Sequence, residues 1–309
     1  MNPAWSIIFF TTAAGAGYGL VALLAAYALA GDAAAGGTPA LFALALSGLL
    51  VSAGLLSSTF HLGHPERAWR ALTQWRSSWL SREGVLALAC YVPALAWAWQ
   101  LWRGAPAGSV LPLATALLAV ATVYATSMIY ASLKTIDAWH RGGVPLNYLL
   151  LALASGAVLW LALRQWAGVA DARDAVVTAA LLFVAALAKR RYWAAIDTRA
   201  PTSTLESATG LGSLGAVSSL SWPHTEDNYL LKEMGYVVAR RHAAKLRRIA
   251  VICAFVLPFA AALASVALAD AVGSALLALA VLSLALGLVI ERWLFFAEAK
   301  HAVALYYGR

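Results

Sequence analysis

Apolar runs of membrane-spanning length recur from one end of this sequence to the other. A helix needs about 20 apolar residues to cross the hydrocarbon core of a bilayer. Only 12% of the 309 residues are charged, against about 25% in soluble domains. Because no water reaches the bilayer core, each run must form a helix that satisfies its own backbone hydrogen bonds. The sequence therefore predicts an all-α, multi-pass membrane protein.

Eight such runs are separated by segments rich in glycine and proline. The sixth is the weakest, because its purely apolar core covers only 175–188, so seven spans are the alternative. We predict one transmembrane domain over residues 1–309, in which a long connection, 189–248, joins the sixth and seventh helices. The predicted spans lie near 4–30, 40–62, 83–102, 111–133, 145–164, 169–188, 249–270 and 274–296.

Positive charge predicts the orientation of this bundle. Lysines and arginines that flank short loops are retained in the cytoplasm. With the N-terminus inside, nearly all of them fall on the inner side, and the exceptions are Arg103, Arg164 and Arg173. We therefore expect both termini and the two large connections, 63–82 and 189–248, to be cytoplasmic.

Polar side chains within the spans are few and collect near the predicted cytoplasmic ends. His61 ends the second span, Glu83 begins the third, Tyr130 and Lys134 close the fourth, and Arg292 lies near the end of the eighth. A polar group in a membrane span is costly, so such a group indicates a functional site. Histidine titrates near neutral pH, and burial can raise the pKa of a glutamate toward that range.

This set of residues suits a quinone, whose oxidation or reduction moves two protons and two electrons. The site needs a hydrogen-bonding partner at each quinone oxygen, at least one of which changes protonation, and apolar walls for the ring and tail. His61 and Glu83 form the predicted pair, with Tyr130 and Lys134 at the second oxygen and Arg292 completing the quinone-binding set. An ordinary ion pair with the preceding glutamate is the alternative for Arg292, and an extended position toward the lipid headgroups is the alternative for Lys134.

The sequence does not favour other cofactors in this chain. None of its six histidines lies in mid-membrane, so no haem is expected. Cys90 and Cys253 are isolated in apolar runs, so no iron–sulfur cluster or disulfide is expected. No line of carboxylates or thiols crosses the predicted bundle, which disfavours metal binding and transport.

The segment HLGHPERAWRALTQWRSSWLSREG at 61–84 resembles the His-Leu-Gly-x-Pro-x-Arg-Ala segment of membrane anchor subunits of the dimethyl sulfoxide reductase family, which are complex iron–sulfur molybdoenzymes. MIYASLKTIDAWH at 128–140 and ERWLFF at 291–296 support this likeness. The resemblance implies a non-catalytic subunit in a bacterial cytoplasmic membrane. Such a subunit exchanges electrons between the quinone pool and an iron–sulfur partner, which serves a molybdopterin catalytic subunit. It also implies that His61 and Glu83 act at the quinone site.

The likeness includes a connection that points to one branch of this family. Residues 204–248 resemble the insert in anchor subunits of the cytoplasmic sulfite-oxidising molybdoenzyme, and sulfite is implied by this resemblance alone. In dimethyl sulfoxide reductase itself the catalytic subunits lie outside the cytoplasm. Here the loop that follows His61 is basic, so the partners are expected on the cytoplasmic face.

The long connection is interpreted as a docking arm for the iron–sulfur subunit. Residues 207–220 are rich in glycine and serine and are expected to be extended, whereas 228–248 has apolar residues at helical spacing. An amphipathic helix lying on the membrane is the alternative, because this segment ends in ARRHAAKLRR. Contacts with the partners are predicted at Arg67, Trp69, Asn228, Tyr229 and Lys232.

Three functions remain to be compared. The first is a quinone-reactive anchor that receives electrons from sulfite oxidation. The same pocket would serve an anchor of a quinol-oxidising terminal reductase, because its residues do not determine the direction of electron flow. The third is a transporter or a purely structural anchor. A transporter would need polar residues at mid-membrane and interrupted helices, and a structural anchor would tolerate the loss of His61 and Glu83.

Overall fold

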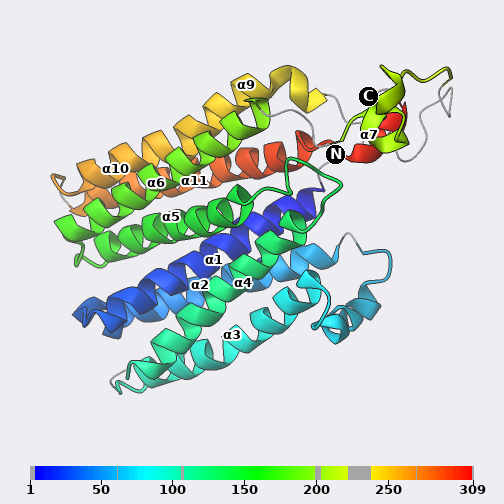
Figure 1. The fold of residues 1–309 in the computed structure, drawn as a ribbon. Helices are drawn as coiled ribbons and strands as arrows, with labels where there is room; N and C mark the ends of the chain where they lie inside the picture. Colours follow the sequence, from blue (N-terminus) through cyan, green and yellow to red (C-terminus); the bar gives the residue numbers. More distant parts are fainter. Residues whose placement is uncertain are drawn as a thin grey trace.

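The computed structural model describes residues 4–60, 62–105, 108–198, 203–221, 238–268 and 270–307. Within these ranges it is a bundle of long helices that lie side by side, with both ends of the chain at the same end of the bundle (Figure 1). The long helices are α1 (Trp5–Leu29), α2 (Thr38–Thr59), α3 (Trp79–Trp102), α4 (Val110–Ala131), α5 (Gly143–Trp166), α6 (Ala172–Thr198), α9 (Val238–Val251), α10 (Leu257–Ser265) and α11 (Asp270–Ala297). The short elements are η1 (Ala33–Gly36), η2 (Pro65–Gln74), α7 (Leu205–Thr209), η3 (Gly212–Leu214), η4 (Ile252–Val256) and η5 (Ala302–Tyr307).

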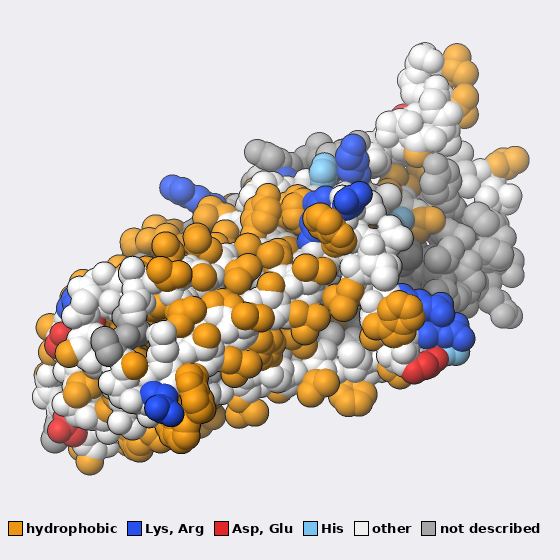
Figure 2. Space-filling view, turned by 90° about the horizontal axis from the view of Figure 1, so that it is seen from below, with side chains coloured by type: hydrophobic (Ala, Val, Ile, Leu, Met, Phe, Trp, Pro, Cys, Tyr) orange, Lys and Arg blue, Asp and Glu red, His pale blue; other side chains and the backbone are white. Residues whose placement is uncertain are grey.

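Seven helices in the described part of the chain are long and apolar enough to cross a membrane. Apolar side chains cover the length of the face shown in Figure 2, and charged side chains gather near its two ends. Helix α6 is not among the seven, although it has 27 residues. Arg173 and Asp174 at its start and 189–191 near its end shorten its apolar stretch, which is the reason that the sixth span is the weakest in the sequence.

Helix α1 is the centre of the bundle and packs against α2, α4 and α5. Its approach to α5 depends on Gly19 and Gly156. A Cβ atom on Gly19 would lie 1.7 Å from the carbonyl oxygen of Ala152, and one on Gly156 would lie 2.2 Å from the carbonyl carbon of Gly19. Small residues allow membrane helices to pack backbone against backbone, where van der Waals contact replaces the hydrophobic driving force that water provides.

Several predicted boundaries are shifted in the structure. Helix α2 ends at Thr59, so the span predicted to end near His61 is shorter, and His61 itself lies outside the described residues. Helix α3 begins at Trp79, because polar residues next to an interface still form helix when their side chains find partners. Glu83 is therefore one turn inside α3 rather than at its first residue.

The connection after α6 also differs from the expected extended loop. Helix α7 overlaps the start of the segment predicted to be extended, 207–220, and η3 lies within it. Helix α7 has a capping box, in which Thr204 and Ser207 each accept a hydrogen bond from the other's backbone N–H. It ends at Gly210, which has a φ of 70°. Local capping thus gives short helical turns to a segment whose composition indicated a loop.

The basic segment before the seventh span belongs to the same helical rod as that span. Helix α9 continues through the π-helical turn η4 into α10, and Pro258, which has no backbone N–H, lies just beyond this turn. Ser283 of α11 donates a hydrogen bond of 2.9 Å to the carbonyl of Cys253, which lies in the turn. The described part of the predicted docking helix, from Val238, therefore leads directly into the bundle.

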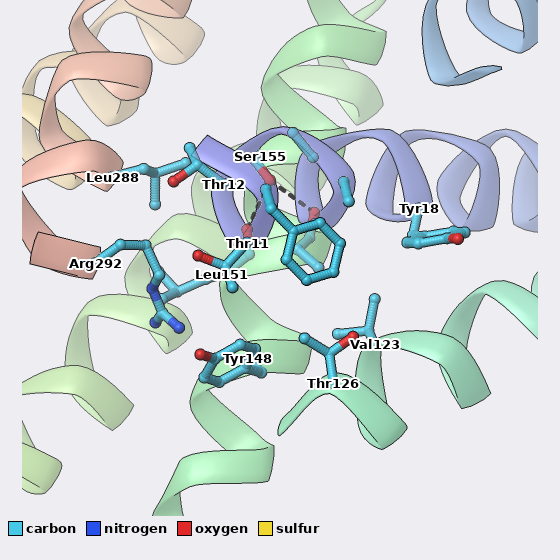
Figure 3. A pocket seen from close by; sticks show the side chains of 15 residues that line it. Thr11, Thr12, Tyr18, Val123, Thr126, Tyr148, Leu151, Ser155, Leu288 and Arg292 are labelled. Carbon is cyan, nitrogen blue, oxygen red and sulfur yellow. Dashed lines mark hydrogen bonds between the residues drawn. The ribbon is translucent and has the colours of Figure 1, made fainter. Parts of the chain in front are cut away.

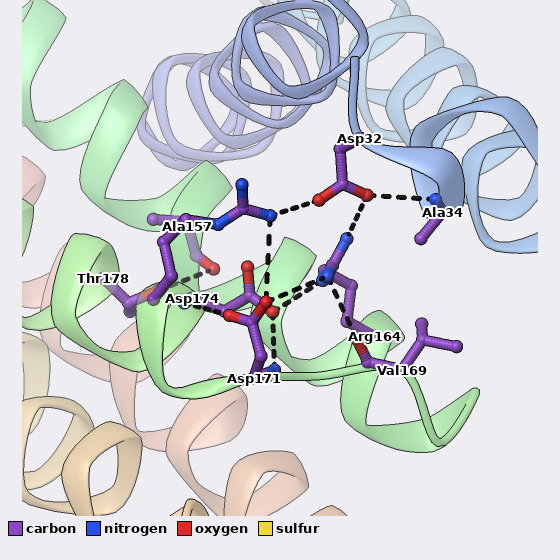
Figure 4. Close-up of polar contacts among 9 residues, drawn as sticks. Asp32, Ala34, Ala157, Arg164, Val169, Asp171, Asp174 and Thr178 are labelled. Atoms are coloured by element: carbon purple, nitrogen blue, oxygen red, sulfur yellow. Dashed lines mark hydrogen bonds and ion pairs between the residues drawn. The ribbon is translucent and has the colours of Figure 1, made fainter. Parts of the chain in front are cut away.

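A buried ion cluster closes the end of the bundle opposite the termini. Arg164 of α5 donates hydrogen bonds to Asp32 (2.8 Å) and Asp174 (2.6 Å) (Figure 4). Arg173 of α6 also forms an ion pair with Asp32. Arg164 is only 3% exposed. These carboxylates neutralise two of the three arginines that the charge pattern assigned to the outer side.

Loss of the Asp32 carboxylate is expected to destabilise this end of the bundle. Asp32→Asn should lower the free energy of unfolding by about 3 kcal/mol, because the buried Arg164 loses a charged partner. Burial acts to raise the pKa of Asp32, but hydrogen bonds and charge from Arg164 and Arg173 hold it below its usual value. The stabilisation should therefore be complete above about pH 4 and decline as the pH falls further. Thermal unfolding in detergent measures both effects.

Asp171→Asn, at a carboxylate that is 52% exposed, is the matched control. An equal loss of stability in the two variants would contradict the prediction.

Candidate functional site

The start of α3 holds the preceding segment η2 and directs Glu83 into the bundle. Ser81 donates a hydrogen bond to a backbone carbonyl of η2. Arg82 donates to the carbonyls of Trp75 and Arg76, the two residues that follow η2, at 3.0 and 2.7 Å. Gly84 leaves room for Leu72, because a Cβ atom there would lie 2.7 Å from the Leu72 side chain. The residues around Glu83 in the sequence SREG therefore bind η2, while Glu83 is 4% exposed.

Glu83 has one hydrogen-bonding partner in the described part of the chain, the hydroxyl of Thr126 on α4. This hydroxyl lies within hydrogen-bonding distance of the Glu83 carboxylate and of the Thr122 carbonyl, which is 3.0 Å away. A hydroxyl both donates and accepts. Thr126 can therefore donate to an ionised Glu83, or accept from a protonated Glu83 while it donates to Thr122. The pair suits a carboxyl group that changes protonation.

Tyr130 lies one turn beyond Thr126, inside an aromatic cluster. Its ring stacks on Tyr148 at 5.9 Å between centroids and meets Trp139, Phe295 and Phe296 edge to face at 5.2 to 5.5 Å. Such pairs stabilise by about 0.5–1.5 kcal/mol each beyond the area they bury. The cluster joins α4, α5 and α11 at the same end of the bundle as Glu83.

A buried ion triad lies against this cluster. Glu291 of α11 forms ion pairs with its neighbour Arg292 and with Lys189 of α6, and all three side chains are at least 96% buried. The Arg292 guanidinium lies 4.1 Å from the centre of the Tyr148 ring, and the Lys189 ammonium lies 4.4 Å from the Tyr192 ring. The sequence suggested the pair of Glu291 and Arg292, but it did not indicate that Lys189 joins them.

The signal that could have identified Lys189 is its helical spacing. It follows the apolar core of α6 by one residue, and Tyr192 and Trp193 lie three and four residues later on the same helix face. The Lys189 ammonium contacts both rings, at 4.4 and 4.9 Å from their centroids. In the structure this face of α6 is turned into the protein, because Lys189, Tyr192 and Trp193 are all buried.

A groove of about 820 Å³ runs between α2 and α3, with α1 at its base. Its walls are almost entirely apolar. The buried hydroxyl of Tyr18 makes no well-formed hydrogen bond with a described residue, whereas Ser52 and Tyr91 are hydrogen-bonded to each other at 2.7 Å. The groove includes Ala87, which is one helical turn beyond Glu83. The Glu83 carboxyl group is thus close to one end of this apolar groove.

The structure brings together three of the five residues predicted to bind a quinone. Glu83, Tyr130 and Arg292 are buried at one end of the bundle, and Lys134 is exposed in the loop after α4. Arg67 and Trp69, the predicted docking residues in η2, are exposed. His61, Asn228, Tyr229 and Lys232 lie outside the described residues. Thr126, Tyr148 and Lys189 are the additional polar residues of this region.

Comparison with known proteins identifies relatives over the whole chain. The family described as DMSO reductase anchor subunit (DmsC) matches residues 1–308. The C subunit of the sulfite dehydrogenase of Allochromatium vinosum is 32% identical over 327 aligned residues, which cover 99% of this chain and 99% of that protein. The anaerobic dimethyl sulfoxide reductase chain YnfH of Escherichia coli is 32% identical over 126 residues, which cover 39% of this chain and 43% of that protein. The predicted family is confirmed, and the chain belongs to the dimethyl sulfoxide reductase anchor subunits.

Proposed function

We propose that this chain is the quinone-reactive membrane anchor of a molybdopterin and iron–sulfur oxidoreductase that oxidises sulfite in the cytoplasm. The chain passes electrons between an iron–sulfur subunit and the quinone pool and carries no metal centre of its own. The observation that carries this proposal is the buried Glu83 carboxyl, paired with the Thr126 hydroxyl close to one end of an apolar groove.

The residues of this region fit a quinone. The groove has the volume for a flat ring and part of an isoprenoid tail, and the Tyr18 hydroxyl, which makes no well-formed hydrogen bond with a described residue, can donate to an oxygen within it. A bound quinone would supply a carrier of two electrons and two protons. Glu83 would exchange a proton with one quinone oxygen, and His61, the second residue after α2 in the sequence, is proposed to bind the other. Tyr130 and Arg292, which are buried in the adjoining aromatic cluster and ion triad, and Lys134, which is exposed, are the other proposed quinone-binding residues.

The proposed topology has eight membrane crossings with both termini in the cytoplasm. Helix α6 would add an eighth crossing to the seven long apolar helices. Its central residues are apolar, and the ion pairs at its two ends reduce the cost of its charges. The location of both chain ends at one end of the bundle supports an even number of crossings. The exposed Arg67 and Trp69 would then face the partner subunits in the cytoplasm, together with 228–232.

The match over nearly the full chain favours sulfite as the substrate of the catalytic partner, since that relative is described as a subunit of sulfite dehydrogenase. The second candidate is the anchor of a quinol-oxidising dimethyl sulfoxide reductase, favoured by the partial match to YnfH. Both would use the same groove and the same carboxyl group. The redox potentials of the partners, rather than residues of this chain, would set the direction of electron flow.

Deletion of this chain tests the anchor function. Membranes from cells that lack it should lose sulfite-dependent reduction of a membrane quinone, while sulfite oxidation with a soluble dye persists in the cytosolic fraction. The physical reason is that the catalytic subunits keep their own cofactors but lose both attachment and quinone access. Undiminished quinone reduction in these membranes would contradict the proposal. Dimethyl sulfoxide-dependent quinol oxidation in place of sulfite oxidation would support the second candidate.

A fusion after Arg309 tests the topology. A reporter that is active only in the cytoplasm should be active there, and a reporter that requires export should be inactive. Fusions after Arg103, in the predicted outer loop, are the matched control and should give the reverse result. Activity of the exported reporter at Arg309 would contradict the proposed orientation and the side on which the partners bind.

A further inference from the structure

A small cavity of about 30 Å³ lies beside the pair of Glu83 and Thr126. Thr126 lines it from α4, Tyr148 from α5 and Arg292 from α11, and the Arg292 guanidinium points toward the Tyr148 hydroxyl (Figure 3). One water molecule needs about 10–15 Å³ of such space, so the cavity has room for about two waters. It thus lies between Thr126, the partner of Glu83, and Arg292, a member of the ion triad.

Two polar atoms at this cavity interact with each other but are incompletely hydrogen-bonded. The Tyr148 hydroxyl and the Nη2 atom of Arg292 are buried, and neither makes a well-formed hydrogen bond within the described ranges. An unpaired polar atom in a protein interior is costly, and the cost is larger for a charged group. Buried groups in this situation usually bind ordered water. The cavity therefore suits water better than an apolar occupant.

The ion triad of Lys189, Glu291 and Arg292 lies between this cavity and a second cluster of charged residues, Arg247, Asp197 and Glu298, at the surface. Trp193 lies between the two sets, because its ring contacts the Lys189 ammonium at 4.9 Å and the Arg247 guanidinium at 5.4 Å. Arg247 donates hydrogen bonds to Glu298 at 2.9 Å and to Asp197 at 2.6 Å. Side-chain exposure falls from 54% at Asp197 to 9% at Glu298 and 1% at Lys189. Ionisable groups thus continue from solvent into the bundle.

The chemistry of these groups suits proton transfer. Burial raises the pKa of Glu298, although Arg247 beside it acts in the opposite direction, so this carboxyl can bind a proton closer to neutral pH than a free glutamate. Lys189 interacts electrostatically with both Glu291 and Glu298. Arg292 keeps its charge at all relevant pH values. It would therefore hold and orient water rather than carry the proton.

We propose that water in this cavity completes a proton path from Asp197 and Glu298 through Lys189 and Glu291 to Thr126 and Glu83. The path rests on the proposed quinone function. Reduction of a quinone consumes two electrons, which the iron–sulfur partner supplies, and two protons, of which this path delivers one through Glu83 to a quinone oxygen. Quinol oxidation releases the same proton along the path in the opposite direction.

Hydrogen–deuterium exchange of the Glu83 carboxyl tests this path without turnover. The assembled complex is transferred into deuterated buffer below neutral pH, and the infrared carboxyl band that Glu83→Gln removes is followed over time. In Tyr148→Phe and in Lys189→Met the band should exchange about a hundredfold more slowly, which is the size of effect expected when a positioned proton-transfer group is lost. Tyr148→Phe removes only a hydroxyl and keeps the ring packing, so it should fold even if Lys189→Met does not.

Tyr192→Phe is the matched control, because its hydroxyl donates to the Ala138 carbonyl at 2.9 Å and does not line the cavity. Its exchange rate should equal that of the unmodified protein. Unchanged exchange in Tyr148→Phe, or no carboxyl band that depends on Glu83, would overturn the path. If exchange is unchanged but Glu83→Gln abolishes turnover, the path is wrong and the quinone site stands. If exchange slows but Glu83→Gln turns over normally, the path stands and the quinone assignment is wrong.

Discussion

Glu83→Gln is expected to lower quinone-coupled turnover of the assembled complex by about a hundredfold or more, since general acid–base groups contribute about 10²–10⁴ to rates. Glutamine keeps the size of the side chain and can still bond to Thr126, so the helix packing should survive. It cannot bind or release a proton, so a quinone oxygen would lose its proton donor and acceptor. Sulfite-dependent reduction of a membrane quinone measures the effect, with dye-linked sulfite oxidation as the internal reference.

Two further variants give this experiment its controls. Glu66→Gln changes a carboxylate with a side chain 63% exposed in η2, and its turnover should be unaffected. Thr126→Ser keeps the hydroxyl and should retain most activity, whereas Thr126→Val removes it and should lower activity strongly. Normal turnover of a fully assembled Glu83→Gln complex would refute the site. Such normal turnover is the result expected of a purely structural anchor, whereas a complex that fails to assemble would show that Glu83 is needed for assembly of the bundle.

Gly19→Ala is expected to destabilise the bundle by about 3 kcal/mol or more, because overpacking against an unyielding neighbour costs at least as much as in a soluble core. The new methyl group would lie 1.7 Å from a backbone carbonyl oxygen of α5. Neither helix can avoid this contact by a side-chain rotation, so α1 and α5 must move apart. The fraction of monodisperse protein in detergent and its thermal unfolding midpoint should both fall.

Gly15→Ala is the matched control in the same helix. A Cβ atom at Gly15 has no neighbour within 4 Å. Because alanine favours helix over glycine by about 1 kcal/mol, this variant should be neutral or slightly stabilising. The two variants should therefore shift the unfolding midpoint in opposite directions. Equal effects would show that helix propensity, rather than close packing of α1 and α5, determines the stability at Gly19.

Most helix positions follow from local sequence. The apolar runs at 4–30, 111–133 and 145–164 correspond to α1, α4 and α5 within about two residues at each end, which is the uncertainty of helix boundaries in general. Apolar length and glycine or proline between runs suffice for this agreement, because a bilayer permits little besides helices. The larger differences lie where polar residues continue the helix, as at the start of α3 and the end of α6.

The candidate site was predictable in part. A glutamate at a helix end next to an apolar run marks Glu83 as unusual, and the structure buries it. Its partner Thr126 was not predictable, because threonine is common in apolar helices and the sequence does not show how α3 and α4 are rotated about their axes. Lys189 was missed for the same reason, since its pairing with Glu291 depends on α6 and α11 facing each other.

The sequence by itself determined a bundle of apolar helices and marked Glu83 beside one of them, because hydropathy and charge act along the chain. Only the tertiary structure decided which helices meet, which glycines permit backbone contact, and which charges form pairs. These features depend on distances between residues far apart in sequence, such as Glu83 and Thr126 or Lys189 and Glu291. The apolar pattern of a helix indicates which positions suit an apolar environment but not which residues they contact.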